Sequence, residues 1–416
     1  MNFGLGHLQA AARKPVPRGI LSTGPAVLSY GFRPFFLGAG LFAVLAMTLW
    51  IGALTLGWDI GGSYGPLNWH AHEMLFGYTS AALAGFMLTA IPNWTGRLPV
   101  AGAPLLGLVA LWGAGRLVML APAFFGAIPS AVIEASFLPV LGALAAREIV
   151  AGRNWKNLRV LAEVALLSMA NAAFHFTVQT GGDPIVTLRL TVAIYIALIS
   201  LIGGRIIPSF TRNWLVKAGA DRLPSPAGRL DKFAIGILIL ALALWTVLPE
   251  GRVTAGIAVV AALAQTARLV RWRGWGTLDE PLLVVLHIAY AFLPIGLIGV
   301  AMSAMGWLSA PSVLHLMTVG LISNMTLAVM TRASRAHTGR PLTATVTTSL
   351  IYLAIFAAAI VRPFAEVLPE YYHLILGISG ACWILAYSGF VAEYAPILLS
   401  PTVKGMPLRS SPKAMT

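Results

Sequence analysis

The chain has 416 residues, of which 58% are hydrophobic and only 10% are charged. Soluble domains carry about 25% charged residues, so this composition excludes a soluble globular protein and predicts an all-α, polytopic membrane protein. The net charge of +14 is compatible with nucleic-acid binding, but the positions of the basic residues favour a membrane surface instead. The single cysteine, Cys382, excludes an intramolecular disulfide, a cysteine-rich metal site and a covalently attached haem.

In chain order, twelve apolar segments are long enough to cross a bilayer, with boundaries at proline, glycine and charged residues. The expected spans are Phe36–Leu56, Ala71–Ile91, Gly102–Leu120, Ile128–Ala146, Leu158–Thr180, Pro184–Ile206, Phe233–Leu248, Val253–Leu269, Pro281–Met302, Leu308–Met330, Leu342–Val361 and Tyr372–Tyr394. This predicts a single domain of 12 transmembrane helices over residues 36–395, with tails at 1–35 and 396–416. The longest connection is expected at Pro208–Asp231.

Lysine and arginine residues are distributed unevenly between the two sides of these spans. Nearly all of the 28 lie on the side of the N-terminus, and the opposite segments contain only Arg252 and Arg362. Because basic loops stay in the cytoplasm, this bias predicts that both termini are cytoplasmic. The basic residues are then expected to contact anionic lipid headgroups, and no nucleic acid is needed to explain the charge.

With this orientation, several ionisable residues share one depth near the outer membrane surface. They are the histidines His70, His72, His175 and His315 and the arginines Arg116 and Arg189. Ionisable residues inside a membrane are costly and usually functional, and imidazole is a common ligand of iron, copper and zinc. The pattern predicts a metal centre in the outer half of the bilayer. Alternatively, the histidines hydrogen-bond headgroups or backbone, and the arginines pair with Glu134 or extend to the surface.

Two of the expected spans share a longer pattern. From His72 and again from His315 the sequence reads H-x-M-x-x-G, and both copies continue in register to a Thr-Gly-Arg, at 95–97 and 338–340. No gap is needed to align them. This predicts a parallel repeat that relates the second and tenth helices, with His72 and His315 at equivalent positions.

Four stretches of the chain resemble the NnrS family. They are GFRPFF at 31–36, WHAHEMLFGY at 69–78, GGRIIPSFTRNW at 203–214, and the segment from HLMTVG at 315–320 to MTRASRAHTGRPL at 330–342. The resemblance runs from residue 31 to the twelfth span. It implies a bacterial inner-membrane protein with haem and copper, linked to nitric oxide metabolism and nitrosative stress, often alongside denitrification. It assigns no metal ligands, so these are predicted from depth and from the repeat.

The repeat favours a single haem b held by His72 and His315, one from each side. The cations Arg116 and Arg189 are expected near its propionates. If the iron needs an open position for nitric oxide, only one of the two histidines stays bound. His175 could replace either of them.

Copper is expected at a second position. His70 has no counterpart in the repeat, because the matching residue is Val313, and Glu73 and Met74 share its helix face. His175 could join His70 at this metal. His287, in the inner half of the ninth span, is either a ligand or a hydrogen-bonding core residue.

Two functions fit these features. The first is a metalloprotein that binds or turns over nitric oxide at a centre in the outer half of the bilayer, as an oxidoreductase with an unidentified electron donor or as a binding protein. The second is a transporter or assembly factor that supplies copper or haem to another respiratory enzyme. Twelve spans suit a transporter, but a repeat of the second and tenth helices does not give the usual two halves of six.

Overall fold

The computed structural model describes residues 24–403, which are helical apart from their connecting segments. Twelve helical segments are long and apolar enough to cross a membrane, which confirms the predicted spans. They are α1 (Phe32–Leu56); α2 (Gly65–His72) with α3 (Thr79–Thr95); α4 (Ala103–Leu120); α6 (Ala127–Ala135) with α7 (Phe137–Ala151); α8 (Leu158–Gln179); α9 (Ile185–Lys217); α10 (Arg229–Val247); α11 (Arg252–Val270); α12 (Pro281–Ala304); α13 (Ala310–His315) with α14 (Asn324–His337); α15 (Val346–Val361); and α16 (Tyr372–Leu399). The predicted tails, 1–35 and 396–416, lie partly outside the described residues.

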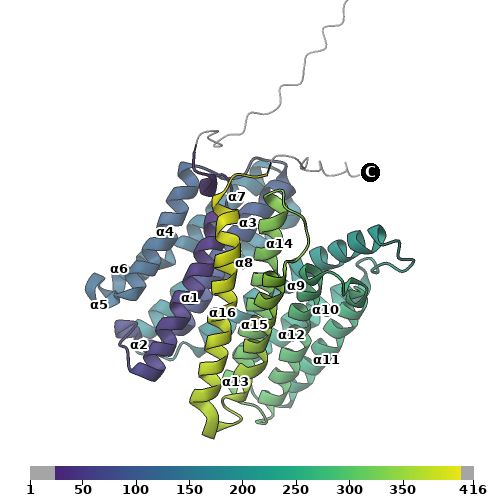
Figure 1. The fold of residues 1–416 in the computed structure, drawn as a ribbon. Coiled ribbons are helices and arrows are strands. Elements are labelled where there is room, and N and C mark those ends of the chain that lie inside the picture. The colour runs from purple at the N-terminus through teal and green to yellow at the C-terminus, as the bar shows by residue number, and fades with distance from the viewer. Residues whose placement is uncertain (1–23, 404–416) are drawn as a thin grey trace, which may run out of the picture.

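The spans form one closed bundle in which the last helix, α16, packs beside the first, α1 (Figure 1). Both described chain ends lie at the top of Figure 1. The backbone of Val403 bonds Thr338 there, and the neighbouring His337 lines a cavity with Arg205 and Arg332, so we call this the basic end. Arg33 fastens the first span to the last there, because its guanidinium donates to the backbone carbonyls of Leu398 (2.9 Å) and Ser400 (2.6 Å). The opposite end carries α2 and α13, and we call it the histidine end.

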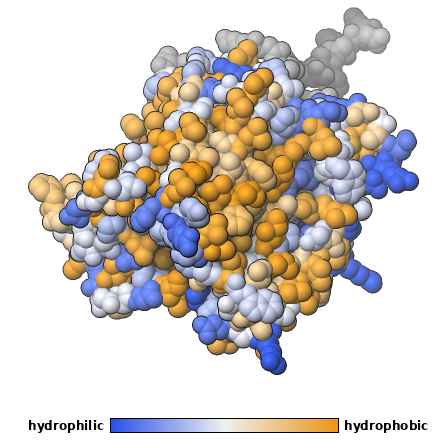
Figure 2. Space-filling model, turned by 60° about the horizontal axis from the view of Figure 1, so that its bottom comes forward, coloured by the Kyte–Doolittle hydropathy of each residue, from blue (hydrophilic) through white to orange (hydrophobic). Residues whose placement is uncertain are grey.

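The outer surface of the bundle is suited to lipid. Hydrophobic residues cover most of the face seen in Figure 2, and hydrophilic residues gather in separate patches. Large apolar side chains such as Leu117 and Leu353 are more than half exposed. Apolar surface of this extent is unfavourable in water and favourable in a bilayer, where helices satisfy their own backbone hydrogen bonds.

The second and tenth spans each contain a π-helical turn at the same place in the shared pattern. These turns are Glu73–Tyr78 and Leu316–Ser323, so each begins directly after the histidine of its copy. Each span is also followed by a glycine with positive φ, Gly96 at 68° and Gly339 at 74°. The repeat stays a prediction, but the two copies agree in these backbone features. π-Helical turns are rare and tend to lie at functional sites.

Helix α9 is longer than hydropathy predicted. The expected span ended at Ile206, and Pro208–Asp231 was expected as a connection, but the helix continues through Pro208 to Lys217. Its last turns carry polar residues such as Arg212 and Asn213, which lower the mean hydropathy and hide the extension from a sequence-based assignment. A proline within a helix removes only one backbone hydrogen bond, so the helix can continue past Pro208.

Candidate metal centres

A cluster of buried polar side chains joins the second, third, fourth and fifth spans. Each member is at most 5% exposed, although the surrounding residues are apolar. We call this group the buried cluster, and its members are His72, Glu73, Arg116, Glu134, Asn171 and His175. Burying polar groups in such a position costs free energy unless the groups bind one another or a ligand.

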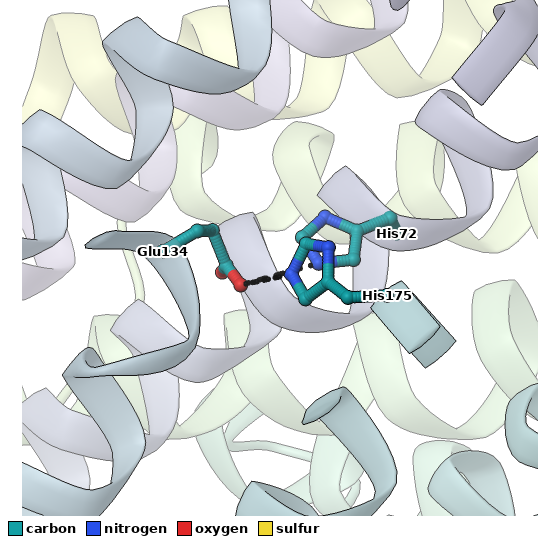
Figure 3. Close-up of side chains that lie close together, drawn as sticks. All are labelled: His72, Glu134 and His175. Atoms are coloured by element: carbon teal, nitrogen blue, oxygen red, sulfur yellow. Dashed lines mark hydrogen bonds and ion pairs between the residues drawn. The ribbon is translucent and has the colours of Figure 1, made fainter. Parts of the chain in front are cut away.

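Two imidazole rings and one carboxylate converge at the centre of the cluster (Figure 3). Nε2 of His175 lies 2.9 Å from Oε2 of Glu134, and Nε2 of His72 lies 3.3 Å from the same oxygen. Among residues 24–403, these three side chains form the one group whose ligand atoms are spaced to hold a metal ion, all within 4.8 Å of one another. Two imidazoles with one carboxylate suit iron, copper or zinc.

The opposite nitrogen of each ring is already engaged. Nδ1 of His72 lies 2.8 Å from Oε1 of Glu73, and Nδ1 of His175 lies 2.7 Å from the hydroxyl of Tyr64. Such partners orient metal-binding histidines and direct the remaining nitrogen toward the ion. The residues therefore fit a metal. Nε2 of His72 also lies 3.0 Å from Oδ1 of Asn171.

Arg116 lies between the two carboxylates of the cluster. Its Nη1 donates to Glu73 and its Nη2 to Glu134, both at 2.5 Å. This agrees with the alternative of a pairing with Glu134 and corrects the expectation that Arg116 contacts haem propionates, because its terminal nitrogens already bind carboxylates. A guanidinium held by two carboxylates neutralises charge that would otherwise be buried.

The absence of a side chain at Gly77 makes this pairing possible. A Cβ at this position would lie 2.5 Å from Nη1 of Arg116 and 3.1 Å from Oε2 of Glu73. Gly77 belongs to the π-helical turn, and its carbonyl accepts a hydrogen bond of 2.9 Å from Trp112. The π-helical turn therefore places the backbone of Gly77 directly against the guanidinium of Arg116.

The second candidate centre is a cavity of about 290 Å³ at the histidine end, which we call the outer cavity. Its polar lining includes His70, His315 and Arg362, and Met74 contributes a thioether. The remaining walls are largely apolar and come from the first, second, sixth, tenth and twelfth spans. His72 does not line this cavity.

The two histidines of the outer cavity have nitrogen atoms available for a ligand. Nδ1 of His315 lies 2.7 Å from the carbonyl of Pro311, which leaves Nε2 without a hydrogen-bond partner in the described part of the chain. Nδ1 of His70 is buried with no partner there, and its ring stacks on Trp50 at 4.4 Å between centroids. Apolar walls, two available imidazoles and a nearby guanidinium suit a non-covalent haem. The residues therefore fit this group.

These positions correct the expectation that His72 and His315 hold one haem. His70 and His72 are two residues apart, roughly 200° around a helix, so they must face different neighbours. The structure turns His72 to the buried cluster and His70 to the outer cavity. It also separates Glu73, which binds His72 and Arg116, from His70, so Glu73 is not a partner of His70 in a copper site.

Arg362 is the cation that lines the outer cavity, and it pairs with Glu366 at 3.0 Å. Arg189 does not line the cavity, and its Nε is buried without a partner in the described residues. The sequence contained a signal for Arg362, since it is one of only two basic residues on the histidine side. Its position in a connection, outside the predicted spans, does not by itself indicate a role at an intramembrane site.

His287 is remote from both centres in its contacts. Its Nδ1 lies 2.9 Å from the carbonyl of Leu283 and its Nε2 lies 3.2 Å from the hydroxyl of Thr211. Both nitrogens are engaged within the helices, which agrees with the alternative of a hydrogen-bonding core residue. Asn171, in contrast, lies within the buried cluster, where its side chain contacts His72 and Glu134.

The fold and these sites define a polytopic helical membrane protein with two groups of histidines suited to metal. Comparison with protein families agrees with this class and makes it specific. The chain matches the family described as "NnrS protein" over residues 26–402, nearly its whole length, and it belongs to the NnrS family. Among the curated proteins, none matches this chain.

Proposed function

We propose that the protein is a haem- and copper-containing protein of a bacterial cytoplasmic membrane that acts in nitric oxide metabolism or protection from nitrosative stress. Membership of the NnrS family and the twelve apolar spans support this proposal. The main supporting observation is that four histidines form two separate groups. His72 and His175 lie in the buried cluster, whereas His70 and His315 line the outer cavity.

In this proposal the outer cavity would hold haem b through His70 and His315. Trp50 keeps the His70 ring in a fixed plane by stacking, and the carbonyl of Pro311 selects the tautomer of His315. Arg362 lines the same cavity and would pair with a propionate. When bound, the haem would supply an iron that can bind nitric oxide.

The buried cluster holds copper in the same proposal, with His72, His175 and Glu134 as ligands. Glu73 and Tyr64 orient the two imidazoles, and Arg116 balances the negative charge of the carboxylates. The apolar surroundings exclude water from the cluster. Nitric oxide is small and dissolves in membranes, so it needs no aqueous channel to reach these helices.

The test is to purify the full-length protein and its single variants and to measure haem and metals in each. His70→Ala and His315→Ala should lose haem or change its visible spectrum, whereas copper remains. His175→Ala and Glu134→Gln should lose copper, whereas haem remains. Adding nitric oxide to the wild type should shift the haem spectrum.

Two results would contradict the proposal. If both His70→Ala and His315→Ala keep full haem with an unchanged spectrum, the outer cavity is not the haem site. If the wild type binds haem or copper only in substoichiometric, exchangeable amounts, the protein is better described as a transporter or assembly factor for these groups.

A further inference from the structure

A second large cavity, of about 380 Å³, lies at the basic end of the bundle, and we call it the basic cavity. It is formed by the second, fifth, sixth, ninth and tenth spans. Its polar lining includes Asn93, Asn157, Arg205, Arg332 and His337. No acidic residue lines it, so two guanidinium groups face one space without a carboxylate.

The two arginines lack ion pairs within residues 24–403. The guanidinium of Arg332 instead lies over the ring of Phe210, 4.3 Å from its centroid. Arg205 has only a long contact of 3.5 Å to Oδ1 of Asn157. Glu163 is close enough to Arg205, and Glu280 to Arg332, for their charges to interact, but neither carboxylate lines the cavity or forms an ion pair with these arginines. Glu280 instead accepts backbone hydrogen bonds from Leu282 and Ala344. The two guanidinium groups are therefore available to an external anion.

The basic cavity continues into an apolar one. A smaller cavity of about 80 Å³ shares Phe86, Ile202, Ile206 and Val329 with it, and lies deeper in the bundle between the second, sixth and tenth spans. Its remaining lining is almost wholly apolar. An inorganic anion would need only the arginines, but an anion with a hydrocarbon chain would fill both spaces.

We propose that the basic cavity is a binding site for one phospholipid with a net negative charge. The phosphate pairs with Arg205 and Arg332, and Asn93 and Asn157 are placed to hydrogen-bond the headgroup. One acyl chain follows the apolar cavity between α3, α9 and α14. This goes beyond general attraction of basic loops to headgroups, because it specifies one lipid, held between helices that also carry the candidate metal sites.

The experiment uses native mass spectrometry of the full-length, detergent-purified protein after lipid has been removed by washing. Phosphatidylglycerol is added back, with phosphatidylcholine and inorganic phosphate as separate probes. The wild type should bind one phosphatidylglycerol at least about tenfold more tightly than phosphatidylcholine, because phosphatidylcholine carries the same phosphate but adds a quaternary ammonium cation that the two arginines repel. Inorganic phosphate should not displace it.

Two sets of variants test the location. Arg205→Gln with Arg332→Gln should weaken phosphatidylglycerol binding at least about tenfold. The matched control is Arg159→Gln with Arg212→Gln, which removes two exposed arginines outside the cavity and should change binding less than about twofold. If the glutamine pair does not fold, Ala333→Leu, which fills the cavity and keeps both charges, should weaken binding instead.

Three results would overturn the proposal. Equal binding of both lipids would remove the role of charge, and displacement by inorganic phosphate would assign the site to a free anion. Loss of haem from the Arg205 and Arg332 double variant would mean that the arginines hold haem propionates. Haem content measured in the same samples separates this outcome from failure of the proposed haem site, because His70→Ala leaves the basic cavity intact.

Discussion

Replacing Arg116 tests whether the buried cluster is held together by charge. Arg116→Met keeps most of the side-chain volume and removes the guanidinium that binds Glu73 and Glu134 at 2.5 Å each. Both carboxylates are at most 1% exposed, so water cannot replace the lost partner. Breaking a buried ion pair by removing one partner costs about 3–5 kcal/mol. We expect a loss of this size in the free energy of unfolding.

The assay is reversible unfolding of metal-free protein in mixed detergent micelles, followed by circular dichroism. The control is Arg212→Met, which removes an exposed arginine from α9 and should change the unfolding free energy by less than about 0.5 kcal/mol. Combining Arg116→Met with Glu73→Gln and Glu134→Gln should recover much of the loss, because the uncompensated charges are then absent. A loss below about 1 kcal/mol for Arg116→Met alone would refute the reasoning, since an ordinary surface ion pair contributes that much.

Three further predictions address the turn, the haem site and the orientation. Gly77→Ala should destabilise the protein by about 1–3 kcal/mol in the same unfolding assay, because its methyl group would displace Arg116; Gly113→Ala, which adds a methyl group in open space, should have little effect. Arg362→Gln should speed the transfer of haem to a haem-scavenging protein, whereas Arg189→Gln should leave the transfer rate unchanged. Faster transfer from Arg189→Gln than from Arg362→Gln would instead favour Arg189 as the partner of the propionates. A reporter enzyme that is active only outside the cytoplasm should give signal when fused within residues 57–66 and none at the C-terminus, and the opposite pattern would invert the orientation.

The spans could be predicted because each depends on local composition. A membrane helix needs a run of apolar residues, and this requirement is visible in the sequence without knowledge of its neighbours. A prediction based on apolar composition cannot detect the extension of α9 past Pro208, because the last turns of this helix contain polar residues. The depth of the histidines was predicted from the spans and the charge bias, and two of the histidines that it grouped, His72 and His175, lie together in the structure.

The partners of each histidine could not be predicted, because depth along a helix does not give its rotation. The sequence placed His70 and His72 at one level, but only the packing of the second span decides which of them faces the fourth and fifth spans. The π-helical turn after His72 adds to this difficulty, since it departs from the regular α-helical spacing on which such an assignment relies. Glu134 and Arg362 lie in other helical segments, so the sequence separation between them and the histidines carries no information about contact.

The spacing of the spans suggests how His72 and His315, which the sequence predicts to be equivalent, come to lie at different sites. The twelve spans can be divided in chain order into three groups of four. The first spans of the three groups begin at Phe32, Trp155 and Pro281, and the second spans begin at Gly62, Ile185 and Ala310, so each place recurs at a similar interval. Neighbouring spans pack in chain order, and the twelfth packs against the first. We interpret the bundle as three groups of four spans around a ring.

In a ring, equivalent residues occupy equivalent pockets and are related by a rotation, so they need not meet. His72 lies against residues of the fourth and fifth spans, whereas His315 lines a cavity formed by the first, second, sixth, tenth and twelfth spans. The first copy differs by having His70 where the second has Val313, and His70 reaches the cavity of the second copy from the side of the first. Among the differences between the two copies, this one supplies the outer cavity with its second histidine, from a different group of spans than His315.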